Sequence, residues 1–347
     1  MRDQSELGHV SRRGILKGAG VGLGVAATAG LWPEMLLAQE KVAFYSGSAV
    51  EPTNDLCKMF TEKTGTPMEY FRAGSNNLAQ KIEQEVKANQ VRASVVGLTN
   101  PTLARKWAKD GLLLQYASPQ FKEYPAEFVL ENYYGPMHGE PHVMAYNTEI
   151  VKAEDAPKTW TDLVDPKWKN KLVLTDAASS NSALHWFAAM RATYGKEFLQ
   201  KLADQNVLIK TGGAEVGATL VSGERQAAAM ITQGHTQRAI AAGGKLRIVI
   251  PPEGAPMLYT VIFIPAKAPN PEVGKKFLDF VLSQEAQQML DGKHFSTSLR
   301  KGMPWNETGT GAKPLSEVKP IASSPEDLEK ELAMTEELLT EYNDLFK

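Results

Sequence analysis

Leu172–Leu174 is a short apolar run, and the residues that follow it, Asp176–Ser182, are small and polar. Ser179, Ser180 and Asn181 are residue types that cap helix N-termini, and apolar residues at helical spacing come after them. A helix N-terminus presents unpaired backbone N–H groups and the positive end of the helix dipole. The segment therefore predicts a strand, a turn and a helix start that bind a small anion, with Asp176 beside them. The alternative is a plain capped helix after a buried strand.

Similar small, polar turns follow other predicted strands. In the N-terminal part of the chain, apolar runs at 41–45, 68–71 and 95–99 alternate with helical patterns, which indicates a parallel sheet covered by helices. Such sheets bind ligands at the carboxyl ends of their strands. Arg72 offers a planar, permanently charged group for a carboxylate or phosphate, with a surface ion pair as its alternative role. The candidate residues at these turns and at a later predicted helix start are Ser46, Ser48, Arg72, Gly74, Ser75, Asn100, Gly212 and Gly213.

Composition limits the class of function. The 347 residues include 38 basic and 40 acidic side chains, so there is no positive surplus and we expect no nucleic-acid partner. Cys57 is the only cysteine, which excludes an internal disulfide and a cysteine metal cluster. A chain of this length exceeds what one core usually supports, so two lobes are expected.

The N-terminal residues are typical of an export signal. Arg12 and Arg13 precede an uncharged stretch rich in Gly and Ala, and Leu36–Ala38 offers a small residue at a cleavage point. The paired arginines resemble the twin-arginine signal, and the uncharged stretch is too short for a membrane span. We therefore expect residues 1–38 to be removed on export to the periplasm by the twin-arginine machinery.

An ordered set of motifs resembles a known family. A predicted strand ends at Tyr146–Thr148 and is followed by Trp160–Leu163, by Asp165–Lys171 and by the serine turn described above. Ser283–Gln287 continues the similarity, which covers nearly all of Val42–Leu290. No single motif is decisive, but the set is similar to the bacterial extracellular solute-binding proteins of ABC importers. The subgroup includes ferric-, thiamine-, polyamine- and phosphonate/sugar-phosphate-binding members.

This resemblance implies an α/β, two-lobed periplasmic-binding-protein-like type II fold, with a ligand cleft between lobes joined by two hinge strands. Lobe one is expected over 39–142 plus 259–347, with the C-terminal helix, and lobe two over 143–258. Tyr146 is expected at the hinge, facing the ligand or packing there. Asp176 and Glu253 are expected to bind a ligand hydroxyl or amine, or to cap helices. Two further ligand candidates follow the strand at 227–232, namely Gln233 and His235.

The resemblance implies capture of a small solute by hinge closure and its delivery to an ABC permease in the inner membrane. We expect an anionic ligand (an organic phosphate, phosphonate or carboxylate), a monomer, no cofactor and no catalysis. Ferric iron is the alternative within the family. Iron-binding relatives tend to carry adjacent tyrosines where this chain reads Gln233–His235, so no metal ligand is assigned. An acyl-transfer enzyme, suggested by His185 near the serine turn, is disfavoured because the chain has no Gly-x-Ser-x-Gly motif.

Overall fold

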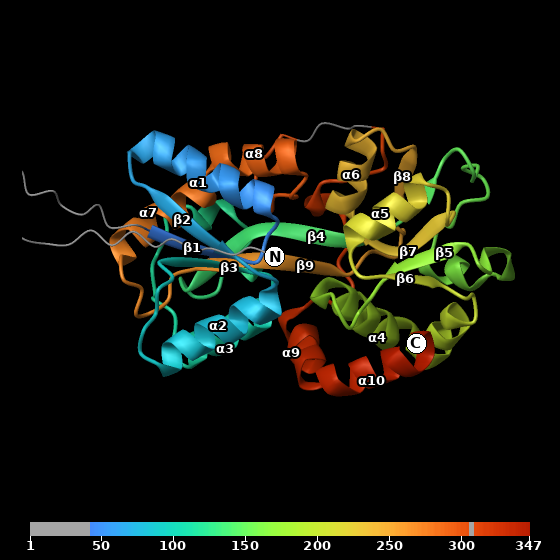
Figure 1. Ribbon diagram of the computed structural model, residues 1–347, viewed down its shortest axis with the longest axis horizontal. Coiled ribbons are helices and arrows are strands. Elements are labelled where there is room, and N and C mark those ends of the chain that lie inside the picture. Colours follow the sequence, from blue (N-terminus) through green and yellow to red (C-terminus); the bar gives the residue numbers. More distant parts are fainter. Residues whose placement is uncertain (1–41, 305–308) are drawn as a thin grey trace, which may run out of the picture. The chain divides into compact units, whose positions relative to one another are not determined.

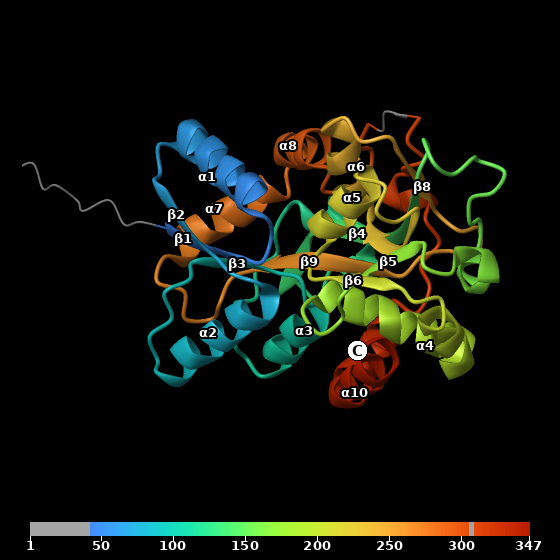
Figure 2. The same ribbon diagram turned by 45° about the vertical axis from the view of Figure 1, so that its right-hand side comes forward.

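The computed structural model describes residues 42–304 and 309–347 (Figures 1 and 2). The expected export signal, residues 1–38, lies outside the described residues. Within the described ranges, every helix is too short or too polar to span a bilayer. The strands are β1 (Val42–Ser46), β2 (Met68–Arg72), β3 (Val95–Leu98), β4 (Tyr134–Asn147), β5 (Leu172–Thr175), β6 (Leu208–Lys210), β7 (Ala227–Thr232), β8 (Leu246–Val249) and β9 (Met257–Phe263). The helices are α1 (Val50–Thr64), α2 (Ser75–Lys87), α3 (Pro101–Lys109), α4 (Asn181–Ala203), α5 (Gly213–Val221), α6 (Gln233–Ala241), α7 (Pro271–Val281), α8 (Gln284–His294), α9 (Pro325–Ala333) and α10 (Thr335–Phe346).

The strands form two parallel groups joined by long antiparallel strands. Their order is β2-β1-β3-β9-β4-β7-β5-β6, and β8 pairs with β4. β1 is parallel to β2 and β3, and β5 is parallel to β6 and β7. β4 pairs with β9 over residues 134–141 and with β7 and β8 over residues 142–147. β4 therefore belongs to both groups, and we name the group with β1, β2, β3 and β9 the first lobe and the group with β5 to β8 the second lobe.

Helices cover both faces of each lobe, because successive strand residues point to opposite sides of a sheet. In the first lobe Phe44 packs with residues of α1 and α7, whereas Tyr45 packs with residues of α2 and α3. In the second lobe one core contains residues of α4 and the other contains residues of α5. Figure 1 shows α1, α7 and α8 on one side of the first-lobe strands and α2 and α3 on the other. This is the α/β arrangement that the alternating pattern predicted.

Helix α1 illustrates why the local sequence specifies these elements. Leu56 and Phe60 lie one turn apart and are fully buried, so one face of the helix packs on the sheet. The ring of Phe60 contacts that of Phe277 from α7 edge to face. The 5.1 Å between their centroids lies within the range of about 4.5–7 Å that such pairs prefer. Gly65 ends the helix at a φ of 71°, a left-handed conformation that glycine adopts without strain. The helix start next to Ser48 is thereby held at the end of β1.

The C-terminal residues form two helices: α10 packs on α4 of the second lobe, whereas α9 contacts both α3 of the first lobe and α4. The sequence predicted one helix belonging to lobe one, whereas α9 and α10 meet at Met334, and α10 lies along α4. The ring of Tyr342 contacts Phe187 at 5.5 Å between centroids. Arg191 of α4 donates hydrogen bonds to Glu337 and Glu341 of α10. The apolar stripe of α10 complements α4. The lobe boundaries, with residues 259–347 assigned to lobe one, stay predictions.

Candidate functional site

The ends of β1 and β2 bring three of the predicted residues together. Ser46 and Arg72 occupy the same register position of the parallel pair. The Ser46 hydroxyl is buried and lies 2.7 Å from the hydroxyl of Thr53 in α1. The Nε of Arg72 donates to the carbonyl oxygen of Ser48 at 3.0 Å, and the rest of this side chain is exposed. Arg72 is thus tied to the turn after β1 with its charge in solvent.

The starts of α2 and α3 stand next to this turn. Gly74 is the N-terminal cap of α2, and the Ser75 hydroxyl accepts a hydrogen bond from the backbone N–H of Thr99 at 3.3 Å. Asn100 caps α3, because its Oδ1 accepts from the N–H of Leu103 at 2.9 Å. The side-chain carbonyl oxygen of Asn100 is therefore used to cap α3.

The serine turn after β5 forms the predicted helix start. Ser180 caps α4, since its hydroxyl accepts from the N–H of Ala183. The Ser179 hydroxyl donates to the carbonyl oxygen of Thr211 at 2.9 Å, which joins this turn to the one after β6. Two neighbouring helix starts, those of α4 and α5, are therefore held side by side at the carboxyl ends of parallel strands.

Asn181 connects the two lobes directly. Its Nδ2 donates to the carbonyl oxygen of Thr99, at the end of β3, at a distance of 3.2 Å. The neighbouring Ser182 hydroxyl lies 2.6 Å from Nε2 of His142 on β4. The start of α4 thus faces the strand ends of the first lobe. We use the name interlobe cleft for the region where the strand ends of the two lobes face each other.

His235 lies against the start of α5. A Cβ atom on Gly213 would lie 2.7 Å from Nδ1 of His235, so the ring occupies the space that a side chain there would need. The same Nδ1 lies 2.7 Å from the Thr232 hydroxyl at the end of β7. Burial, together with the charge of Arg238, lowers the pKa of His235 to about 4, and its imidazole is neutral at pH 7.

Two predicted residues lie outside the interlobe cleft. Tyr146 is 3% exposed and packs in the second-lobe core. Its backbone pairs with that of Ala227, the first residue of β7. This placement favours the alternative of packing over contact with a ligand, because the strand ends of the interlobe cleft lie at the other end of β7. Glu253 accepts a hydrogen bond from the N–H of Trp160 at 2.8 Å and thus supports a short helical turn rather than a ligand.

Two other predicted residues have side chains occupied within the protein. Gln233 is fully buried, and its amide both donates to and accepts from the backbone of Lys313. Asp176 accepts from the N–H of Ala178 and forms an ion pair with Lys347 at 3.2 Å. Burial raises the pKa of Asp176, but these hydrogen bonds outweigh it and hold the pKa below its usual range. Both residues therefore organise the turns around the cleft instead of offering free groups to it.

The floor of the interlobe cleft comes from β4, which the sequence analysis did not assign to the site. His138, Glu140 and His142 alternate along the strand and so share one face. Nε2 of His138 lies 3.0 Å from the Ser48 hydroxyl, next to the start of α1. Both rings are buried, and burial lowers the pKa of each imidazole. In the sequence, this face of β4 was indicated only by the polar residues at every second position, His138, Glu140 and His142.

Arg238, on the second turn of α6, is a further residue that the sequence analysis missed. Its Nη1 donates to the carbonyl oxygen of His294, at the end of α8, at 2.9 Å. The carboxylates of Glu140 and Glu51 are the acidic charges that act on it. The half-buried guanidinium group therefore lies between α6 and the first lobe, at the rim of the cleft floor.

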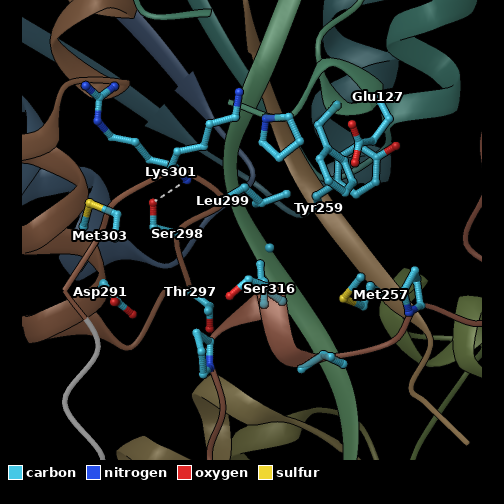
Figure 3. A pocket seen from close by; sticks show the side chains of 18 of the residues that line it. Glu127, Met257, Tyr259, Asp291, Thr297, Ser298, Leu299, Lys301, Met303 and Ser316 are labelled. Carbon is cyan, nitrogen blue, oxygen red and sulfur yellow. Dashed lines mark hydrogen bonds between the residues drawn. The ribbon is translucent and has the colours of Figure 1, made fainter. Parts of the chain in front are cut away.

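A separate pocket lies on the other face of β4 and β9, the two strands that join the lobes (Figure 3). Its volume is about 370 Å³, and Gly139 belongs to its wall, whereas the flanking residues of β4 face the cleft. Figure 3 shows Met257 and Tyr259 of β9 on one side and Leu299 and Met303 on the other. No predicted site residue lines this pocket. It is therefore distinct from the interlobe cleft.

Comparisons with known proteins agree with this geometry. The family model described as bacterial extracellular solute-binding protein matches residues 92–309. The chain is 24% identical over 292 residues to "Iron uptake protein A1" of Synechocystis sp., covering 78% of this chain and 79% of that protein. It is 27% identical over 260 residues to "Putative 2-aminoethylphosphonate-binding periplasmic protein" of Salmonella typhi, covering 71% of each.

A solved structure supports the fold. The periplasmic binding protein AfuA from Actinobacillus pleuropneumoniae, with exogenous fructose-6-phosphate bound, superposes with a TM-score of 0.74 at 23% identity. The superposition covers 88% of this chain and 98% of that chain. The predicted two-lobed α/β class is thereby confirmed.

Proposed function

Because this chain belongs to the bacterial extracellular solute-binding protein family, we propose that it captures a small organic anion in the interlobe cleft for an ABC importer. The observation that carries the proposal is the hydrogen bond from Asn181 to the carbonyl oxygen of Thr99. This contact holds the start of α4 opposite the strand ends of the first lobe. A ligand between them would meet both lobes at once, and its binding free energy would favour the closed arrangement.

The cleft chemistry supports an anion. The starts of α4 and α5 supply backbone N–H groups, and Arg72 supplies a charge at the end of β2. Each charge-assisted hydrogen bond contributes about 1.5–3 kcal/mol. Two of the similar proteins are named for a phosphonate or hold a sugar phosphate, and both ligands carry such an anionic group.

Ferric iron is not favoured, although one similar protein is named for iron uptake. The side chains that follow β7 are bound within the protein, Gln233 to the backbone of Lys313 and His235 to Thr232. Neither is a tyrosine, the anionic oxygen ligand that hard Fe(III) prefers.

The location and partners complete the proposal. Residues 1–38 act as a twin-arginine signal, the protein works in the periplasm as a monomer, and an inner-membrane permease receives the solute. The protein performs no catalysis. The similarity to a periplasmic binding protein and the family itself support the periplasmic location and the permease partner. The paired Arg12 and Arg13 support the export signal.

The test is a thermal-shift screen of the exported protein after bound solute has been removed by unfolding and refolding. The compounds are organic phosphates, phosphonates, carboxylates and ferric citrate. An anion at 100 times its dissociation constant should stabilise the fold by about 2.7 kcal/mol. Stabilisation by ferric citrate alone, or by none of the anions, would refute the proposal.

The matched variant is Arg72→Ala. It should weaken binding of the best anion at least tenfold, about 1.4 kcal/mol, because its charge stands at the strand end. Arg225→Ala, which removes an arginine that bonds to the backbone of Glu224, is the control and should leave affinity unchanged. Unchanged affinity in Arg72→Ala would remove this residue from the site.

A further inference from the structure

Glu140 occupies a central position on the floor of the interlobe cleft. It lies on β4 between His138, whose ring contacts Ser48 of the first lobe, and His142, whose ring contacts Ser182 of the second lobe. The three side chains share a face of the strand. The charge of the Glu140 carboxylate acts on His138 beside it and on His235 and Arg238 of α6.

This carboxylate is not neutralised by a direct partner. Among residues 42–304 and 309–347, no hydrogen bond or ion pair of the Glu140 side chain is found. The flanking imidazoles are buried, which disfavours their charged forms. The charges of Glu140 and Arg238 act on each other and on His235, but the guanidinium hydrogen bond goes to the carbonyl oxygen of His294.

A half-buried carboxylate disfavours a purely anionic ligand. The Glu140 carboxylate would repel the negative charge of such a ligand, whereas the starts of α4 and α5 would attract the same charge. A ligand that also carries an ammonium group removes this conflict, because three N–H donors of that group can meet the free carboxylate oxygens. Arg238 and the helix starts remain available for the anionic group.

We propose that the ligand is an amine-bearing organic anion, with its ammonium group bound by Glu140 and its anionic group held by the starts of α4 and α5 and by Arg238. This inference rests on the proposed function, since it concerns the same cleft. It goes beyond that function by assigning a specificity residue and a zwitterionic ligand class.

The experiment compares matched probes by calorimetry on the ligand-free protein. Each pair differs by the amine alone: 2-aminoethylphosphonate with ethylphosphonate, phosphoethanolamine with ethyl phosphate, and β-alanine with propionate. In the pair with the preferred anionic group, the amine-bearing probe should bind at least tenfold more tightly. Glu140→Gln, which keeps the shape and removes the charge, should bring this ratio near one while leaving the affinity for the amine-free probe equal or higher.

Two controls separate this effect from a general loss of structure. Glu154→Gln removes an exposed carboxylate, and Glu127→Gln removes one from the pocket behind the hinge strands. Both should keep the wild-type ratio. If the amine-free probe binds as well as its partner, or if Glu140→Gln keeps the preference, the inference is overturned and the proposed function stands. If no probe of any pair binds but another anion of the thermal-shift screen does, the inference is overturned and the proposed function stands. If no anion of that screen binds either, both are overturned.

Discussion

The adjacent polar residues of the serine turn, Ser179, Ser180 and Asn181, make three different contacts. The Ser179 hydroxyl binds the turn after β6, and Ser180 caps its own helix. Asn181 reaches Thr99 across the interlobe cleft. Their side chains are therefore used to position the start of α4, and the backbone N–H groups of that start are what remains for a ligand.

Gly213 provides a test at the residue scale. Its replacement by Ala would place a Cβ atom 2.7 Å from Nδ1 of His235, so the ring must move. We expect the free energy of unfolding in a denaturant titration to fall by about 1–3 kcal/mol. Anion affinity should fall as well, because the start of α5 shifts.

Gly292→Ala is the matched control, since a Cβ atom there would meet no heavy atom within 4 Å and the residue lies within α8. It should raise the free energy of unfolding by about 0.4–1 kcal/mol. Equal effects of the two substitutions would show that His235 does not restrict Gly213.

At the scale of elements, α10 explains how α4 is fixed. α4 carries the start that faces the first lobe, and its buried face packs against α10 through Phe187 and Tyr342. Leu338, one turn before Tyr342, is 2% exposed in the same core. The C-terminal helix thus supports α4 through buried contacts such as that of Phe187 with Tyr342.

Leu338→Ala tests this support. Removal of a buried leucine side chain should lower the free energy of unfolding by about 2–5 kcal/mol, through lost burial and the cavity left behind. The exposed Glu336→Ala on the same helix should change it by less than about 0.5 kcal/mol. A loss for Leu338→Ala no larger than that of the control would mean that α10 does not contribute to the folded core.

At the scale of the whole molecule, the two lobes are linked by β4 and β9. β4 crosses from its pairing with β9 to its pairing with β7 at His142. The buried imidazoles of His138 and His142 and the partly buried imidazole of His235 lie near this crossing, and burial lowers the pKa of each. Protonation of any of them would place an unpaired charge inside the junction of the lobes.

The stability of the whole fold should therefore decrease on acidification. The pKa of His235 is about 4 in the folded protein and about 6.5 in an unfolded chain. Between these values the unfolded state binds the extra proton, so the stability present above pH 6.5 is lost as the pH falls towards 4. The free energy of unfolding, measured at intervals from pH 7 to pH 4, should fall across this range.

His235→Gln isolates this contribution, because it removes the titrating ring and leaves other groups unchanged. Asp291 opposes the trend in both proteins, since burial raises its pKa to about 6 and its contribution decreases as the pH rises. The variant should show a shallower loss of stability on acidification than the wild type. Parallel pH profiles of the two proteins would contradict the assignment of a neutral, buried His235.

Most local features were predictable from the sequence because they depend on neighbouring residues. The apolar periodicity of α1 and its terminal Gly65 specify a helix wherever the chain folds. The cap at Ser180 likewise needs only the N–H group of Ala183. The strand, turn and helix order of 172–190 followed from such short-range patterns, whereas the two-lobed class was implied by the chain length and by the resemblance to solute-binding proteins.

Only the tertiary structure decided which side chains share the cleft. Tyr146 and Glu140 lie on the same strand, but the pairing of β4 with β7 buries the first and leaves the second at the floor. Arg238 reaches His294 through a contact between residues far apart in the chain. Such contacts depend on strand register and helix packing over long sequence separations, and local periodicity carries no information about them.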